Sequence, residues 1–209
     1  MRTSDMPLHT LPDFPLSEHE PLSQGFLALG LRGFVDAARY VWELPYGRNS
    51  DPADFRLVLS EGRGTCWTRH ALLAALARAH GQPVKLTLGI YEMHERNTPG
   101  VGAVLEHEGL SGIPEAHGYL VVHQRRVDLS RNVPAAESIA AVAVFFIEGQ
   151  IEPEEIGAPQ EEMLRAFIRD WAARRRLDAE RIWRVREACI TAAEVSRSLV
   201  RMRRPSGFQ

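Results

Sequence analysis

The chain has 209 residues, with 25 Lys plus Arg against 27 Asp plus Glu and a formal net charge of −2. This length suits one domain, or one domain with an appendage, that buries a core. The charge argues against a nucleic-acid binder or a membrane-surface protein as a whole, and no apolar run has the length that spans a membrane. The first residues show no secretory pattern and the two cysteines form no disulfide framework, so we expect a cytoplasmic protein with free thiols.

The N-terminal quarter predicts an arm followed by helices. Four prolines within residues 1–22 disfavour a regular helix or central strand, so this segment is expected either as an extended Pro-rich arm lying on the domain or as partly disordered. Apolar residues recur at helical spacing over 23–44 and predict one helix there. An Asp-Pro pair then predicts a short helix over 51–59, because proline suits the first helical position.

Residues 61–70, with the sequence EGRGTCWTRH, join a loop with two glycines to a helix. Thr65 can cap this helix and Cys66 then becomes its first residue, while Gly81 suits the left-handed position beyond its end. A thiol at a helix N-terminus is favoured as the thiolate, and the two glycines would let a substrate approach the backbone. A small, buried, inert residue is the commoner role of cysteine, so the assignment depends on residues downstream.

Three strand-like segments and a long loop follow this helix. Residues 84–91 alternate apolar and mixed side chains and predict a strand, and 115–130 predict a hairpin. The intervening loop, 92–114, is long for a compact domain and is our candidate for a substrate-binding flap. The continuous apolar run 140–147 predicts another strand, which gives a sheet of at least four strands.

The hairpin can supply a base and a residue that orients it. An even number of loop residues places His117 and Asp128 on one face as diagonal neighbours. The other face is then uniformly apolar, with Leu120, Val122, Val127 and Leu129. A three-residue loop would send His117 and Asp128 to opposite faces, so the apolar face favours the even loop.

The C-terminal part predicts two helices, over 161–176 and 178–202. Residues 161–209 hold 12 Arg against 7 Asp plus Glu, but acidic residues are interleaved and no aromatic stacking pattern occurs, which disfavours nucleic acid as the partner. We therefore divide the chain into the arm, a core over 23–150 and a helical extension over 151–209. The extension is expected to pack on the core or at a dimer interface through an apolar stripe of Ile182, Trp183, Val185, Ile190, Val195 and Leu199.

Eight histidines raise the question of a metal site. Cys66 and His70 are one helical turn apart, but His70 lies a full turn away from the N-terminal end of the helix. His117 and His123 share a face of one strand at a separation of about 20 Å, too far for one ion. We expect neither a metal nor a cofactor.

The Gly-Thr-Cys66 start of an Ala/Leu-rich helix, a strand after a Gly-x-Pro break, and His117 and Asp128 on consecutive strands form a recognisable order. This order resembles the transglutaminase-like branch of the papain-like cysteine enzymes over residues 40–130. The resemblance implies an α+β fold in which the cysteine-bearing helix packs on an antiparallel sheet. It also implies that Cys66 is the nucleophile, His117 the base and Asp128 its orienter.

The resemblance further implies acyl transfer or hydrolysis of an amide or ester bond through a thioester, on a peptide or small amide or ester substrate. Hydrolysis by a peptidase or amidase is favoured over cross-linking. The backbone N–H of Cys66 is the expected oxyanion donor, and Trp42 and Tyr46 are side-chain candidates, although core and turn packing is the commoner role of such aromatics. The alternative is a non-catalytic protein-interaction module with the same fold. We expect no nucleic-acid or membrane partner, and a possible homodimer through the C-terminal helices.

Overall fold

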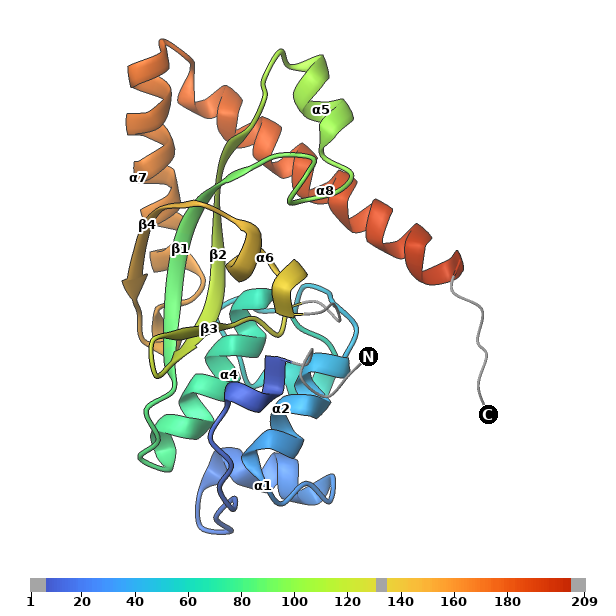
Figure 1. Ribbon diagram of the computed structural model, residues 1–209, viewed down its shortest axis with the longest axis vertical. Coiled ribbons are helices and arrows are strands. Elements are labelled where there is room, and N and C mark those ends of the chain that lie inside the picture. The colour runs from blue at the N-terminus through green and yellow to red at the C-terminus, as the bar shows by residue number, and fades with distance from the viewer. Residues whose placement is uncertain (1–6, 131–134, 204–209) are drawn as a thin grey trace.

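A computed structural model describes residues 7–130 and 135–203, which form a single sheet with helices packed around it (Figure 1). Parts of the predicted arm and of the C-terminal extension lie outside these ranges. The helices are η2 (Pro7–Thr10), α1 (Pro21–Ala28), α2 (Phe34–Glu43), α3 (Leu57–Glu61), α4 (Cys66–Ala79), α5 (Gly102–His107), η3 (Ala135–Glu137), α6 (Ile139–Val142), η4 (Pro153–Glu155), α7 (Ala158–Arg175) and α8 (Ala179–Arg203). The strands are β1 (Lys85–Met93), β2 (Ile113–Val122), β3 (Arg125–Val127) and β4 (Phe145–Gln150).

The four described strands form an antiparallel sheet in the order β3-β2-β1-β4. Its centre is the long pair β1 and β2, in which Gly89 lies opposite His117. Leu86, Leu88 and Ile90 of the predicted strand are buried, and so are Thr87 and Tyr91 between and beyond them, so both faces of β1 are covered. The fold is therefore α+β, as predicted.

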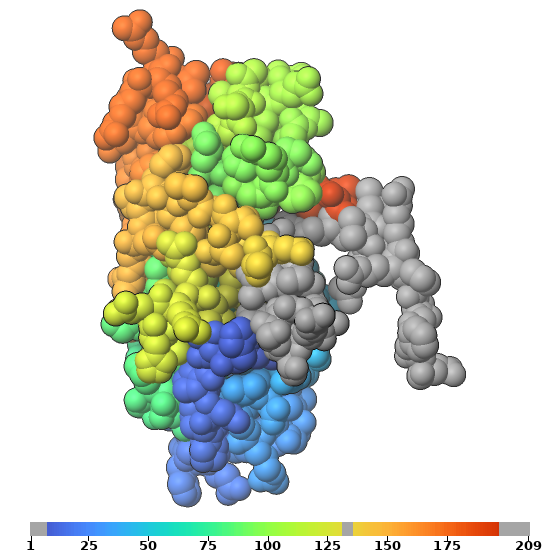
Figure 2. All heavy atoms as spheres, viewed as in Figure 1, coloured from blue at the N-terminus to red at the C-terminus, as the bar shows by residue number. Residues whose placement is uncertain are grey.

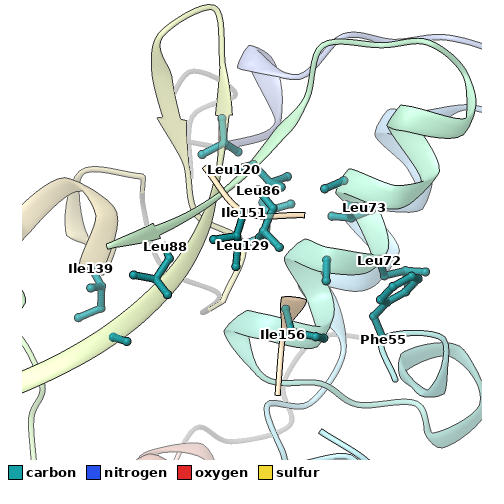
Figure 3. Packing of buried hydrophobic residues seen from close by; sticks show 14 of the residues in the cluster. Phe55, Leu72, Leu73, Leu86, Leu88, Leu120, Leu129, Ile139, Ile151 and Ile156 are labelled. Atoms are coloured by element: carbon teal, nitrogen blue, oxygen red, sulfur yellow. The ribbon is translucent and has the colours of Figure 1, made fainter. Parts of the chain in front are cut away.

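The core lies between the sheet and the helices behind it. The helix α4 packs its leucines into this core, where Leu73 faces Leu86 of β1 and Leu72 lies beside Phe55 (Figure 3). Helices α7 and α8 lie behind the other end of β1 and β2, while β4 and the β2–β3 hairpin form the front face (Figures 1 and 2). Every residue of α4 from Thr68 to Ala77 is buried, which explains its continuous apolar run from Ala71 to Ala77.

Two predicted elements are wrong. The helix predicted over 23–44 is two helices, α1 and α2, because the chain turns at Gly30, where φ is 79°. The strand predicted over 140–147 is instead the short helix α6 followed by β4. In α6 the N–H groups of Ala141 and Val142 both donate to the Ser138 carbonyl, which closes a helical turn within an apolar run.

The segments before the central helix also differ from expectation. The helix predicted over 51–59 begins only at Leu57, because the Asp51 carboxylate accepts from the Ala53 N–H at 2.8 Å and holds a turn there. The N-terminal arm contributes Leu8, Leu11 and Leu16 to the main core. It therefore lies on the domain, as predicted.

The predicted apolar stripe of the last helix is used within the chain. Ile182, Val185 and Cys189 are buried in the core, whereas Val195 is 56 % exposed. The Arg186 guanidinium also ties α8 to β2, with its Nε 2.8 Å from Glu115 Oε2. Among the described residues, no helix is long and apolar enough to cross a membrane.

Candidate active site

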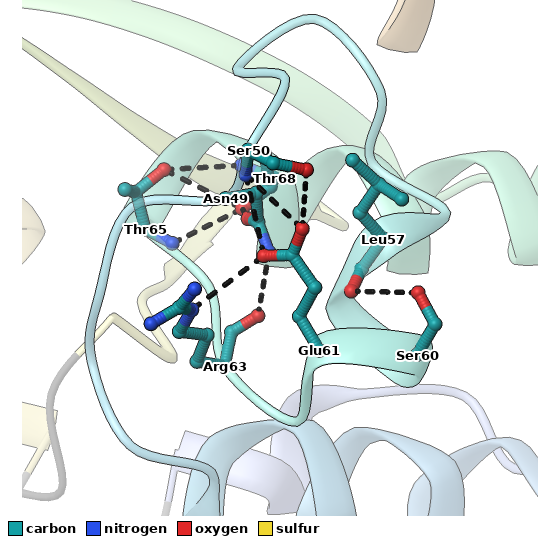
Figure 4. Close-up of polar contacts among 8 residues, drawn as sticks. All are labelled: Asn49, Ser50, Leu57, Ser60, Glu61, Arg63, Thr65 and Thr68. Carbon is teal, nitrogen blue, oxygen red and sulfur yellow. Dashed lines mark hydrogen bonds and ion pairs between the residues drawn. The ribbon is translucent and has the colours of Figure 1, made fainter.

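Cys66 is the first residue of α4, and its position is set by a capping box. The Thr65 hydroxyl accepts from the Thr68 N–H at 3.4 Å, and the Thr68 hydroxyl accepts from the Thr65 N–H at 3.0 Å. Thr68 Oγ1 also donates to Asn49 Oδ1 at 2.7 Å, which anchors the preceding loop (Figure 4). The predicted cap and helix start are confirmed. The thiol accordingly sits at the positive end of a 14-residue helix.

The two glycines before Cys66 also have local structural roles, one conformational and one steric. Gly62 ends α3 in the left-handed conformation, with φ 62°. A Cβ at position 64 would lie 2.9 Å from the Arg69 side chain and 3.0 Å from Thr68 Oγ1. Gly64 therefore makes room for the residues that follow Cys66.

The β2–β3 hairpin brings His117 and Asp128 together. Its loop is the two-residue turn His123–Gln124, with φ of 47° and 64°, so Leu120 pairs with Val127. This is the predicted even loop. His117 Nε2 lies 2.9 Å from Asp128 Oδ2, and both side chains are buried.

Cys66 and His117 form a charged pair. Burial raises the pKa of the Cys66 thiol, but attraction by His117 and hydrogen bonds from His117 and the Gly118 N–H outweigh it, so the pKa is lowered. Burial lowers the pKa of His117, but Asp128 and Cys66 outweigh it and raise the pKa to about 10. Since Nε2 faces Asp128, Nδ1 is the ring nitrogen left for Cys66. Both pKa shifts favour the thiolate form of Cys66 and the imidazolium form of His117.

The Asp128 carboxylate is held by the backbone as well as by His117. Its Oδ1 accepts from the Ser130 N–H at 2.9 Å, and its Oδ2 accepts from the Ala140 N–H at 3.2 Å. Burial alone would raise the pKa of this carboxyl, but His117, His70 and Ser130 hold it far below its usual range. Asp128 is therefore an anion that fixes the orientation of the imidazole through its Nε2 atom.

Two residues of α4 that the sequence analysis assigned no role support this site. His70 is fully buried; its Nε2 accepts from the Leu129 N–H at 2.7 Å and lies 3.9 Å from Asp128 Oδ1. Burial lowers the pKa of His70 to about 4, which keeps the ring neutral and able to accept. The sequence does contain a sign of this role for Arg69 and His70. They follow Cys66 by three and four residues, so these polar side chains lie on the same side of an otherwise apolar helix as the cysteine.

Arg69, the neighbour of His70, is a buried cation. It donates to the carbonyls of Leu44 at 2.7 Å and of Leu129 and Ser130 at 3.4 Å each. Burial lowers its pKa to about 10, so the guanidinium stays charged at neutral pH. It joins the chain before the cysteine loop to the chain around Asp128.

Replacing His70 by leucine should lower the free energy of unfolding by about 1–3 kcal/mol, because the buried Leu129 N–H loses its acceptor. His70→Gln should recover part of this loss, since its amide oxygen can accept. The folded-state pKa of His70 lies below 6.5, so protonation opposes folding; stability should fall from pH 6.5 towards 4 in the wild type, less steeply in His70→Leu. Urea denaturation at several pH values measures both effects. Equal losses in the two variants would contradict the assigned hydrogen bond.

Cys66 and His117 lie in a cleft of about 620 Å³. Its aromatic and apolar lining includes Tyr46, Trp67, Tyr91, Met93 and Ile190. Tyr46 therefore lies where a substrate would bind, whereas Trp42, the other oxyanion candidate, is a buried core residue away from this lining. Trp67 packs on Gly118, where a Cβ would lie 2.6 Å from its ring.

The C-terminal helices form part of the cleft wall. Arg186, Glu187, Ile190 and Glu194 of α8 and the first residues of α7 line it. From the predicted flap, Met93 and Thr98 reach the cleft. Elsewhere in this segment the Glu95 carboxylate accepts from the N–H groups of Gly100 and Gly102, and Glu108 accepts from Arg181 of α8. No cluster of three or more potential metal ligands occurs among the described residues.

Comparison with known families agrees with this geometry. Residues 31–126 match the family model described as the transglutaminase-like superfamily. The matched segment contains Cys66 and His117 and ends two residues before Asp128. No curated protein and no solved structure matches the chain. The resemblance seen in the sequence is confirmed over this segment, and the match suggests papain-like cysteine chemistry.

Proposed function

We propose that this chain, whose residues 31–126 belong to the transglutaminase-like superfamily, is a thiol-dependent enzyme that cleaves an amide or ester bond and transfers or hydrolyses the acyl group. The observation that carries the proposal is the buried Cys66, His117 and Asp128 constellation at the positive end of α4. The same three residues were predicted from the sequence, and their catalytic roles are part of this proposal.

The proposed reaction has two steps, acylation of Cys66 and release of the acyl group. The Cys66 thiolate attacks the carbonyl carbon, and the protonated His117 gives its proton to the leaving amine or alcohol as the thioester forms. Water or an amine then attacks the thioester, His117 takes the proton of this nucleophile, and Cys66 leaves as the thiolate. Asp128 holds the imidazole throughout.

The oxyanion of each tetrahedral intermediate needs donors beside Cys66. The N–H of Cys66 has no acceptor inside its helix, because it belongs to the first turn. We assign this N–H as one donor, and Tyr46 as the side-chain candidate on the cleft wall. Hydrolysis is favoured over cross-linking, and the mass of the released acyl product distinguishes the two. The proposed substrates are peptides or small amides and esters, and a homodimer through the C-terminal helices stays a prediction.

The test compares the two cysteines of the native protein. At pH 7, iodoacetamide should alkylate Cys66 at least tenfold faster than Cys189, as measured by mass spectrometry of the two peptides. His117 lowers the pKa of Cys66, whereas Cys189 is buried and burial raises its pKa to about 11. Cys66→Ala should remove the fast phase, and Cys189→Ala should leave it. Two sluggish thiols would support the non-catalytic interaction module instead.

A further inference from the structure

The cleft has a second polar end, at the start of α7. This helix begins after Gly157, whose φ of 87° and ψ of −127° are accessible to glycine, and no side chain caps it. Its first residues, Ala158 and Gln160, line the cleft that contains Cys66. Pro159 has no N–H and the Glu161 N–H donates to the Gly157 carbonyl, so the first-turn N–H groups without an acceptor inside the helix are those of Ala158 and Gln160.

The side-chain amide of Gln160 gives a second reason to expect a ligand at this end of the cleft. Its side chain is 7 % exposed, yet its amide has no hydrogen-bond partner within the described part of the chain. The other buried amides are bonded: Asn49 Nδ2 donates to the Arg63 carbonyl at 3.0 Å, and Asn97 Nδ2 to the Glu92 carbonyl at 2.8 Å. The fully buried, unpaired side-chain atoms of the described residues do not include those of Gln160, so its amide stays accessible from the cleft that it lines and can bond a ligand there.

The packing around α7 places this end of the cleft beside the helix of Cys66. Ile156, which precedes Gly157, belongs to the same core cluster as Leu72 of α4 and as Phe55, which lies before α3 (Figure 3). A Cβ on Gly157 would lie 2.8 Å from the Ala53 Cβ. Ala53 belongs to the loop that follows Asn49. The Asn49 side chain accepts a hydrogen bond from Thr68, two residues after Cys66. The start of α7 is thus held against the loop that anchors the nucleophile.

The charges of the cleft select a neutral ligand. Glu161, Glu187 and Glu194 all line it, which disfavours a carboxylate. The Arg186 guanidinium is engaged by Glu115 and Glu187, and Arg48 lies 3.8 Å from Glu187 and 3.6 Å from Glu194. An amide group fits both donors and acceptors: its carbonyl can accept from helix N–H groups, and its N–H can donate to the Gln160 oxygen.

We propose that Gln160 and the first turn of α7 form a subsite for a second amide group of the substrate, separate from the bond that Cys66 attacks. The substrate class is accordingly a peptide or a carboxamide-bearing compound and not a simple ester. This inference rests on the proposed function, because it assumes that substrates bind in the cleft of Cys66. Gln160 is a specificity residue that contacts substrate away from the reacting atoms.

The test uses chloroacetyl probes that alkylate Cys66 and differ in the group beyond the warhead. Chloroacetyl glycinamides with one to three glycines carry amides, N-alkyl chloroacetamides of equal length lack them, and chloroacetyl glycines end in a carboxylate. In the wild type, the best glycinamide should react about threefold to tenfold faster than its alkyl analogue, the gain expected from one neutral hydrogen bond. Gln160→Leu should abolish this gain and leave the rate with iodoacetamide unchanged. Gln150→Leu, a matched exposed control, should keep it.

Three results would overturn the subsite. Equal wild-type rates for amide and alkyl probes would show that no amide binds, a result that stands even if Gln160→Leu fails to fold. A faster carboxylate probe would show an anion site. A parallel loss with iodoacetamide in Gln160→Leu, or in the shorter Gln160→Asn, would show that Gln160 supports Cys66 itself. A different result would contradict the proposed function itself: equal iodoacetamide rates for Cys66 and Cys189 in the wild type.

Discussion

Replacing His117 by alanine should move the pH midpoint of Cys66 alkylation from well below ~8.5, the free-thiol value, to ~8.5 or above. In the folded protein, burial is the largest influence on this thiol and raises its pKa, while His117 lowers it. Removal of the imidazolium leaves burial opposed by the helix N-terminus and the Gly118 N–H. The rate at pH 7 should consequently fall more than tenfold, as measured with iodoacetamide between pH 5 and 10.

Two further variants make this experiment specific. His107→Ala removes an exposed imidazole of α5 and should leave the profile unchanged. Asp128→Ala should shift the midpoint less than His117→Ala, because it alters the orientation and basicity of the imidazole and leaves the ring in place. An unshifted midpoint in folded His117→Ala would show that Cys66 and His117 are not a catalytic pair.

The parts of the site that the sequence predicts are those with local signals. Thr65 caps the helix through bonds to Thr68, three residues away, so the position of Cys66 follows from nearby residues. The hairpin register follows from the apolar face of β2 and β3, although His123–Gln124 lacks the Asn-Gly signature of a two-residue turn. Both signals need no knowledge of the rest of the fold.

The parts that the sequence misses depend on partners far along the chain. His70 accepts from Leu129, and Gln160 reaches the cleft because Ile156 packs on α4. Apolar runs such as 140–147 are also ambiguous, since a short run fits a strand or a helical turn equally well. In this run, backbone hydrogen bonds to the Ser138 carbonyl form the helical turn of α6.

Replacing Asp128 by alanine should cost about 3–5 kcal/mol of the free energy of unfolding, the largest stability effect expected for the site. The variant leaves the His117 imidazole and the N–H groups of Ser130 and Ala140 without their buried acceptor. Asp128→Asn should cost less, because its amide oxygen can still accept. Asp170→Ala, on the exposed face of α7, should change stability by less than about 0.5 kcal/mol.

The pH dependence of this loss tests the charge states of the pair. The folded-state pKa of Asp128 lies far below its usual value, so its contribution is present above pH ~4 and disappears in stronger acid. The pKa of His117 is raised from 6.5 to about 10, so its contribution is complete below pH 6.5 and disappears as the pH rises through 10. The stability difference between wild type and Asp128→Ala should therefore be largest between pH ~4 and 6.5 and decline towards pH 10. Urea titrations at pH 5, 6.5, 8 and 9.5 measure it. A difference that stays constant from pH 5 to 9.5 would show that Asp128 does not hold His117 in its charged form.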